Sequence, residues 1–220
     1  MFEVYLTNPE LGRVSTYSVA SKISFLRSHF RKIEELFDLE SKGLMEECWL
    51  ESERTKDHED DSQVDYRASD ALREIEFIYL RMHRYSAVLA AYSYLETSLN
   101  KICSDLQEAN NILLSVTELH GDGINRCKIY LEKLAGIDFS SINGKWSGLT
   151  TLNKIRNCIM HADGDAEKVR GSDKFIKLVE NSTDLSFIEK KLVMVTREFI
   201  EKSINDIEET LLYLVGRKNR

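Results

Sequence analysis

The chain has 220 residues, of which 42% are hydrophobic and one is a proline, and its formal net charge is −7. This length can bury a full hydrophobic core, and the scarcity of proline suits a predominantly helical protein. No stretch approaches the roughly 18 apolar residues of a membrane-spanning helix, and the first residues lack a secretory signal. We therefore expect an all-α protein of the cytoplasm that makes no membrane contact.

The acidic charge is concentrated in one part of the chain. Residues 46–65 hold nine Asp and Glu against two basic residues, and the remainder balances at 28 of each sign. There is no basic stripe of the kind that marks a high-affinity duplex binder, but a local nucleic-acid cleft is allowed. The four cysteines and five histidines lack metal-ligand spacing. We expect no metal site, and we expect the cysteines to be reduced and buried.

The first 65 residues are expected to form an N-terminal helical extension. After an extended lead-in over residues 1–15, an amphipathic helix runs from about Thr16 to Leu50, with Gly43 as a candidate break. The acidic segment Glu51–Asp65 cannot bury enough apolar surface to order itself. We interpret it as a solvated linker, with an acidic docking tail as the alternative. Residues 66–220 form the main helical domain.

A long helix is expected from about Ser69 to Asn110, with a kink near His83–Ser86 because a straight helix would be ~60 Å long. Its apolar residues alternate by four and three, as in a heptad seam: Val88, Tyr92, Leu95, Leu99, Ile102 and Leu106. The seam indicates core packing, with a coiled-coil interface as the alternative. Glu96 and Asn100 lie four residues apart on its flank, either as a surface pair or as support for a site.

Two shorter helices follow. One is expected from Ile124 to Leu134, and the other from about Ser147 to His161. Trp146 opens the second helix and is interpreted as a core residue rather than as a platform for a stacked base.

The C-terminal part combines a loop, a hairpin and a helix. Ala162–Gly171 is expected to be a polar loop, and a β-hairpin is indicated over Leu185–Ile188 and Leu192–Val195. Thr196 is a candidate cap for the last helix, which is expected to end near Val215. Its inward residues are predicted to be Phe199, Ile200, Ile204, Ile207, Leu211 and Leu214.

The residues with the clearest chemical potential lie near the end of the helix over residues 147–161. Asn157 and His161 are four residues apart and share a face. Arg156 lies on the other side of the apolar stripe, which consists of Leu149, Leu152, Ile155 and Ile159. Histidine titrates near neutral pH and arginine binds phosphate oxygens bidentately. These residues are a candidate phosphodiester-cleaving site, with a solvated helix face as the alternative.

The segment Arg156-Asn157-Cys158-Ile159-Met160-His161 resembles the Arg-polar-x-x-x-His signature of the HEPN superfamily. These helical proteins include metal-independent ribonucleases, prokaryotic toxins and phage-defence effectors. The setting is similar as well, because Trp146 opens the motif helix, Gly164 follows the histidine, and an upstream helix carries Tyr94-Leu95-Glu96-x-x-Leu99-Asn100. The resemblance covers residues 70–215 and implies an antiparallel helical bundle of HEPN type.

The resemblance implies an endoribonuclease that needs no cofactor and acts as a toxin or in antiviral defence. The 2′-OH of RNA would attack, His161 would move protons, and Arg156 would neutralise charge on the phosphorane. Asn157 would hold the imidazole or contact a phosphate, with Glu96 and Asn100 as supporting residues.

The resemblance also implies protein partners. A homodimer would face two motif helices across a shared cleft, and an antitoxin or a defence-complex protein would be a further partner. Asp163 stands where related toxins often carry a tyrosine that receives AMP. Silencing by that route is therefore not expected.

Two other readings remain open at the sequence level. The first is a non-catalytic helical module of the same type that binds RNA, nucleotide or a protein partner. The second is an assembly protein whose seam over Val88–Leu106 recruits a partner helix. A monomer in solution, with that seam sealed inside the chain, would exclude the second.

Overall fold

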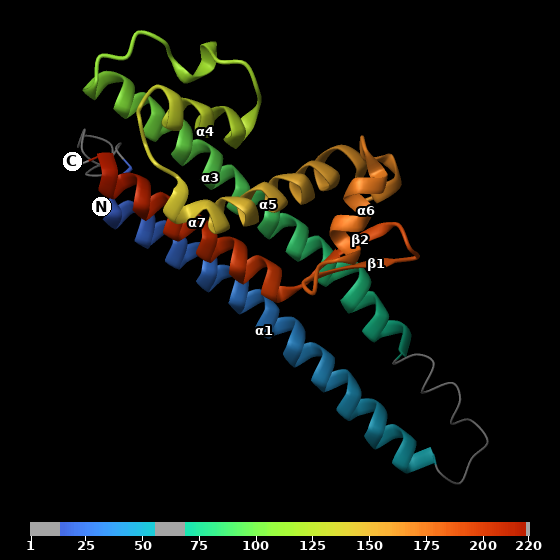
Figure 1. Cartoon of the computed structure of the whole chain (residues 1–220). Helices are drawn as coiled ribbons and strands as arrows, with labels where there is room; N and C mark the ends of the chain where they lie inside the picture. The colour runs from blue at the N-terminus through green and yellow to red at the C-terminus, as the bar shows by residue number, and fades with distance from the viewer. Residues whose placement is uncertain (1–13, 56–68, 219–220) are drawn as a thin grey trace.

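The computed structural model describes residues 14–55 and 69–218 and is predominantly helical, with one small antiparallel sheet (Figure 1). The expected all-α fold class with a small hairpin is thus confirmed. The long helices are α1 (Thr16–Thr55), α3 (Arg81–Ala109), α5 (Asn143–Ala162) and α7 (Arg197–Lys218). The shorter elements are α4 (Gly123–Lys133), α6 (Ser172–Glu180), β1 (Leu185–Ile188), β2 (Leu192–Val195) and 3₁₀ turns at Val116–Glu118, Ser140–Ile142 and Ala166–Lys168.

Helix α7 is the centre of the bundle, because it packs against α1, α3 and α5 (Figure 1). Its apolar residues that were predicted to point inward are all buried: Phe199, Ile200, Ile204, Ile207, Leu211 and Leu214. The backbone N–H of Phe199 donates to Thr196 Oγ1 at 3.2 Å, which confirms the predicted cap. The helix continues through Gly216 to Lys218.

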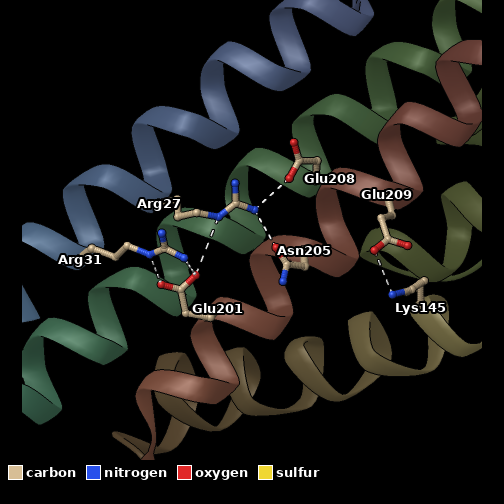
Figure 2. Close-up of polar contacts among 7 residues, drawn as sticks. All are labelled: Arg27, Arg31, Lys145, Glu201, Asn205, Glu208 and Glu209. Atoms are coloured by element: carbon tan, nitrogen blue, oxygen red, sulfur yellow. Dashed lines mark hydrogen bonds and ion pairs between the residues drawn. The ribbon is translucent and has the colours of Figure 1, made fainter.

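Helix α1 lies antiparallel along α7 and is bound to it by arginines (Figure 2). Arg27 Nη2 donates to Asn205 Oδ1 at 2.7 Å and to Glu208 Oε2 at 2.9 Å. Arg31 binds both carboxylate oxygens of Glu201, at 2.6 and 2.9 Å. On its inner side α1 contributes Val19, Ile23 and Phe30 to the common core. The first half of α1 is therefore part of the bundle, whereas its second half extends past the start of α7 (Figure 1).

The heptad seam of α3 is sealed inside the chain. Val88, Tyr92, Leu95, Leu99, Ile102 and Leu106 are each at most 5% exposed. They pack where α3 meets α4, α5 and α7. The seam is therefore part of the core, and this structure leaves it closed to a partner helix.

Two expectations about the first helix are wrong. The helix does not break at Gly43, and residues 51–55 are helical rather than part of a linker. A glycine in an exposed helix interior costs about 1 kcal/mol relative to alanine, which a 40-residue helix with a packed inner face tolerates. The lead-in over residues 1–13 and positions 56–65 of the expected linker lie outside the described residues.

The irregularity in the second long helix also lies earlier than expected. Residues 69–74 are helical, Ile75–Leu80 (η3) is π-helical, and α3 then runs regularly through His83–Ser86. A π-turn holds an extra residue, so it changes which side chains face the bundle. Here Ile75 is buried and Tyr79 stacks on Phe37 of α1, with ring centroids 6.5 Å apart.

The segment after the motif holds more structure than expected. Besides the 3₁₀ turn within Ala162–Gly171, it contains α6, whose nine residues bury only Phe175 and Val179. A helix this short offers too few repeats for its period to be recognised. The hairpin is confirmed, with Leu185 paired to Val195 and Ile188 paired to Leu192.

The burial of side chains tests two further expectations, one for Trp146 and one for the cysteines. Trp146 is 4% exposed and meets Phe139 edge-on at 5.1 Å, so it is a core residue as predicted. Cys103, Cys127 and Cys158 are free thiols and are buried as expected, but Cys48 is only partly buried. In the described part of the chain, no helix is both long and apolar enough to cross a bilayer.

Candidate functional site

A pocket of about 790 Å³ opens beside the second half of α5. Arg156, Asn157 and His161 of the expected site all line it. The other walls come from the turn before α4, from the loop after α5 and from the first residues of α6. Its size is within the range of sites that hold small molecules or nucleotides.

Basic side chains dominate the pocket. Lys154 and Arg156 of α5 meet three further basic residues from the segment after the motif, which are Lys168, Arg170 and Lys174. Among the described residues that line the pocket, the carboxylate is that of Asp122, while Lys168 is paired with Asp165 at 3.1 Å. The pocket is therefore suited to an anion.

Arg156 is held by two neighbours. Its Nη1 donates to Asn157 Oδ1 at 2.9 Å, and its Cζ lies 4.9 Å from the centroid of the Tyr92 ring. A cation over an aromatic face gains roughly 0.5–2 kcal/mol, depending on how far it is desolvated. The ring of Tyr92 thus helps to hold the guanidinium of Arg156 in place at the pocket.

Tyr92 is itself buried, at 2% exposure. Burial raises the pKa of its phenol, and the negative charge of Glu96 raises it further, whereas Arg156 acts in the opposite direction. A Cβ placed on Gly123 would meet both the Tyr92 hydroxyl and Glu96 Oε1. The turn before α4 therefore closes over Tyr92, and Glu96 lies beside it.

The expected supporting residues do not line the pocket themselves. Asn100 Nδ2 donates to the Glu96 carbonyl oxygen at 2.9 Å, and Cys127 Sγ donates to Asn100 Oδ1 at 3.5 Å, which ties α3 to α4. Glu96 reaches the site only through Tyr92. Sequence reasoning missed Tyr92 as a site residue, although its spacing of four from Glu96 placed both on one helix face.

The amide of Asn157 has a different partner from the one expected. It accepts from Arg156, whereas we had expected it to orient the ring of His161. His161 is exposed at the end of α5 and lines the pocket with its neighbour Ala162. The arginine and the amide therefore form one unit, and the imidazole stands beside it at the pocket wall.

The chain after His161 is firmly held. Asp163 ends α5 in a left-handed conformation, and the Gly164 N–H donates to the Cys158 carbonyl at 3.2 Å. The Val193 N–H then donates to the Gly164 carbonyl at 3.0 Å, while the Tyr85 hydroxyl donates to the Val193 carbonyl at 2.6 Å. The end of the motif helix is thus attached to β2 instead of fraying.

The thiol within the motif is not a candidate nucleophile. Cys158 is 1% exposed, and burial raises the pKa of its thiol to about 11. The nucleophile would be the thiolate, which is scarce at neutral pH for such a pKa. Within residues 14–55 and 69–218, no three His, Cys, Asp or Glu side chains gather in a way that could hold a metal ion.

Comparisons of the chain with models of protein families, with curated proteins and with solved structures give no match. The resemblance to the HEPN superfamily therefore rests on the motif and its setting.

Proposed function

We propose that the protein is a metal-independent endoribonuclease of HEPN type and that the pocket beside α5 is its active site. The observation that carries this proposal is the convergence of Arg156, Asn157 and His161 with four further basic side chains on one pocket. Five positive charges against one lining carboxylate favour a polyanion such as an RNA backbone.

Each motif residue has a role in this reaction. The 2′-OH of the substrate attacks the adjacent phosphorus, and the 5′-oxygen leaves, so that a 2′,3′-cyclic phosphate forms. His161 takes or gives the proton, since its exposed imidazole can serve as a general base or a general acid. Arg156, oriented by Tyr92 and Asn157, stabilises the charge on the phosphorane oxygens.

In-line cleavage needs a second proton-transfer group. We propose that a second copy of the chain supplies this group. Its motif helix faces that of the first copy, and the two His161 side chains act as acid and base. Mixing His161→Ala with Arg156→Ala protein tests this composite site. Two damaged copies that together regain full activity would contradict it.

The biological setting is part of the same proposal. The protein acts in the cytoplasm as a toxin or as an antiviral effector, and an antitoxin or a defence-complex protein controls it. Asp163 lies where adenylylation would need a tyrosine, so control is exerted by a bound partner rather than by modification of that position.

The decisive experiment compares RNA cleavage by wild-type and His161→Ala protein in the presence of EDTA. We expect cleavage of single-stranded RNA with 2′,3′-cyclic phosphate ends, and a loss of ~10² to 10⁴ in rate for the variant. Lys145→Ala is a matched surface control, because Lys145 binds Glu209 at 3.1 Å away from the pocket (Figure 2). Equal cleavage by His161→Ala, or strict dependence on added metal, would refute the proposal.

The free energy of unfolding of each variant shows whether a loss of cleavage comes from the chemistry of the site or from a less stable fold. His161→Ala is expected to change the free energy of unfolding by at most ~0.5 kcal/mol, because the side chain is exposed. Ile155→Ala is expected to cost about 2–5 kcal/mol, because Ile155 is completely buried. If His161→Ala protein is unfolded, His161 has a structural role.

A non-catalytic function is the second candidate. The same cationic pocket would bind RNA or a nucleotide without cutting it, and Arg156 would then be a ligand contact. Tight RNA binding by the wild type, weakened in Arg156→Ala, with intact RNA termini by mass spectrometry, would favour this reading.

A further inference from the structure

The outer face of α1 carries large apolar side chains that the bundle does not cover. Phe25, Leu36 and Leu39 are 69%, 59% and 65% exposed, and Leu50 is 43% exposed. Monomeric proteins rarely leave such a row open over several helical turns. The row therefore indicates a surface that another molecule covers.

These residues follow a heptad. Leu36, Leu39, Gly43 and Leu50 are separated by three, four and seven residues, and Phe25 lies eleven residues before Leu36. At ~100° per residue all five fall within about 60° of one another. The buried side chains of α1, such as Ile23 and Phe30, lie on the opposite side. Spacing of this kind is typical of a coiled-coil seam.

The positions along this row are symmetric about its centre. Phe25 lies eleven residues before Leu36, and Leu50 lies eleven residues after Leu39. Two copies of α1 that run antiparallel about an axis between Leu36 and Leu39 therefore bring Phe25 of each copy against Leu50 of the other. Such an isologous contact uses the same surface twice.

The polar positions of the row match under the same symmetry. His29 lies seven residues before Leu36 and Glu46 seven after Leu39, so they face each other in the pair. Lys32 and Gly43 lie four residues on either side, and the absent side chain of Gly43 leaves room for the lysine. On the flank, Glu35 approaches Lys42 of the second copy.

The charge of α1 also selects the antiparallel direction. In residues 16–34, Arg27 and Arg31 bind α7 and Glu34 binds Arg84, which leaves the charges of Lys22 and Lys32. Residues 35–55 hold seven acidic and two basic side chains. An antiparallel pair sets each positive half against a negative half, and a parallel pair would set like charges together. A second copy thus matches this surface in shape, spacing and charge.

We propose that the protein forms a homodimer through the outer face of α1, with the two α1 helices antiparallel about a two-fold axis between Leu36 and Leu39. Helix α7 lies between α1 and α5, so this contact leaves the α5 face of each copy free for the separate pairing of motif helices proposed above (Figure 1). The contact extends from Phe25 to Leu50, a length of ~37 Å at 1.5 Å per residue. This interface does not depend on the proposed ribonuclease activity.

The first test measures mass in solution by light scattering. The Leu36→Glu, Leu39→Glu double variant should have half the mass of the wild type and keep its helical circular dichroism spectrum, because both positions are exposed in the single chain. Tyr17→Glu, Met45→Glu is the matched control, since both residues are exposed on α1 away from the row. It should keep the wild-type mass. A wild type at the chain mass of 25.4 kDa, or an unchanged mass for the Leu36, Leu39 variant, would overturn the proposal.

The second test determines the direction of the helices by disulfide cross-linking in a Cys48→Ser background. Phe25→Cys combined with Leu50→Cys should give covalent dimers under oxidation, and each single variant should stay uncross-linked. Dimers from Phe25→Cys alone would mean a parallel pair and would refute the antiparallel interface. Neither test uses RNA, so failure of α1 pairing and failure of RNA cleavage are separate outcomes.

Discussion

Basic side chains cluster on two faces of the bundle, and the groups that they contact differ between the two faces. On the α7 face, Arg27 and Arg31 of α1 and Lys145 of α5 each bind a carboxylate of α7 (Figure 2). In the pocket beside α5, Arg156 instead contacts an amide and an aromatic ring. Basic residues on the first face hold helices together, whereas in the described part of the chain Lys168 is the pocket residue that pairs with a carboxylate, that of Asp165.

Few of the basic side chains in the pocket form ion pairs. In the described part of the chain, Lys154, Arg156 and Lys174 form no salt bridge, and Lys168 pairs only with its own neighbour Asp165. Leaving like charges together in a concave site without compensation costs stability, which a bound phosphate would recover. This contrast, rather than the number of basic residues, distinguishes a candidate site from an interface.

The largest expected effect compares an arginine from each face. Arg156→Ala should lower the rate of RNA cleavage by ~10² to 10⁴, because it removes the charge that stabilises the phosphorane. Arg31→Ala should leave the rate unchanged, because Arg31 is bound to Glu201 on the other side of the bundle. The cleavage rates of the two variants, measured side by side, check this difference. Equal losses of rate would contradict it.

A large effect on the free energy of unfolding is expected where a buried ion pair joins two helices. Glu34 is 2% exposed, and both its oxygens accept from Arg84, each at 2.8 Å. Glu34→Gln should cost about 3 kcal/mol in the free energy of unfolding, because it leaves the Arg84 charge without its partner. Glu201→Gln, at a partly exposed pair, should cost at most ~1 kcal/mol. Denaturant unfolding of both variants measures the difference, and a similar cost for the two would contradict it.

A smaller effect is expected at the loop that fixes the end of the motif helix. Gly164 has φ +80°, and a Cβ there would clash with the Tyr85 hydroxyl. Gly164→Ala should therefore cost about 1–3 kcal/mol and should also lower cleavage, because the loop beside His161 must shift. In Gly144→Ala the new methyl meets nothing within 4 Å, so this variant should be neutral or slightly stabilising. Thermal unfolding and cleavage assays of the pair check both statements.

The smallest expected effect separates two lysines of the same helix. Lys154 lines the pocket, whereas Lys145 is bound to Glu209. Lys154→Gln should reduce the slope of log affinity for RNA against log salt by ~1, and Lys145→Gln should leave it unchanged. RNA binding by the two variants between low and moderate salt measures the slopes. Identical slopes would mean that the pocket does not contact phosphate.

The periodicity of the sequence predicted most of the fold, and the reasons differ by element. In α3, α5 and α7 the apolar residues recur over many turns, so the buried face was predicted residue by residue. The two strands of the hairpin were likewise predicted, because two β-prone runs flank a short turn. The nine-residue α6 and the π-helical turn were not found, since neither repeats long enough to show a period.

The candidate site was predicted only in part. Helix geometry placed Asn157 and His161 on one exposed face of α5, but it placed Arg156 on the other side of the apolar stripe. Tyr92 and Arg156 are 64 positions apart in the chain, and only the packing of α3 against α5 brings the ring under the guanidinium. The packing of helices also distinguishes Lys145 from Lys154. Helix α7 supplies carboxylates to Lys145 and none to Lys154.

The sequence by itself determined the helical class, the faces that are buried and the short motif with its arginine, amide and imidazole, because these follow from local spacing and side-chain chemistry. The tertiary structure decided which charges are neutralised and which line a pocket, and that Asn157 binds Arg156 instead of His161. It also left the outer face of α1 uncovered. These features depend on which helices meet, and that is set by the packing of the whole core rather than by the pattern of any one segment.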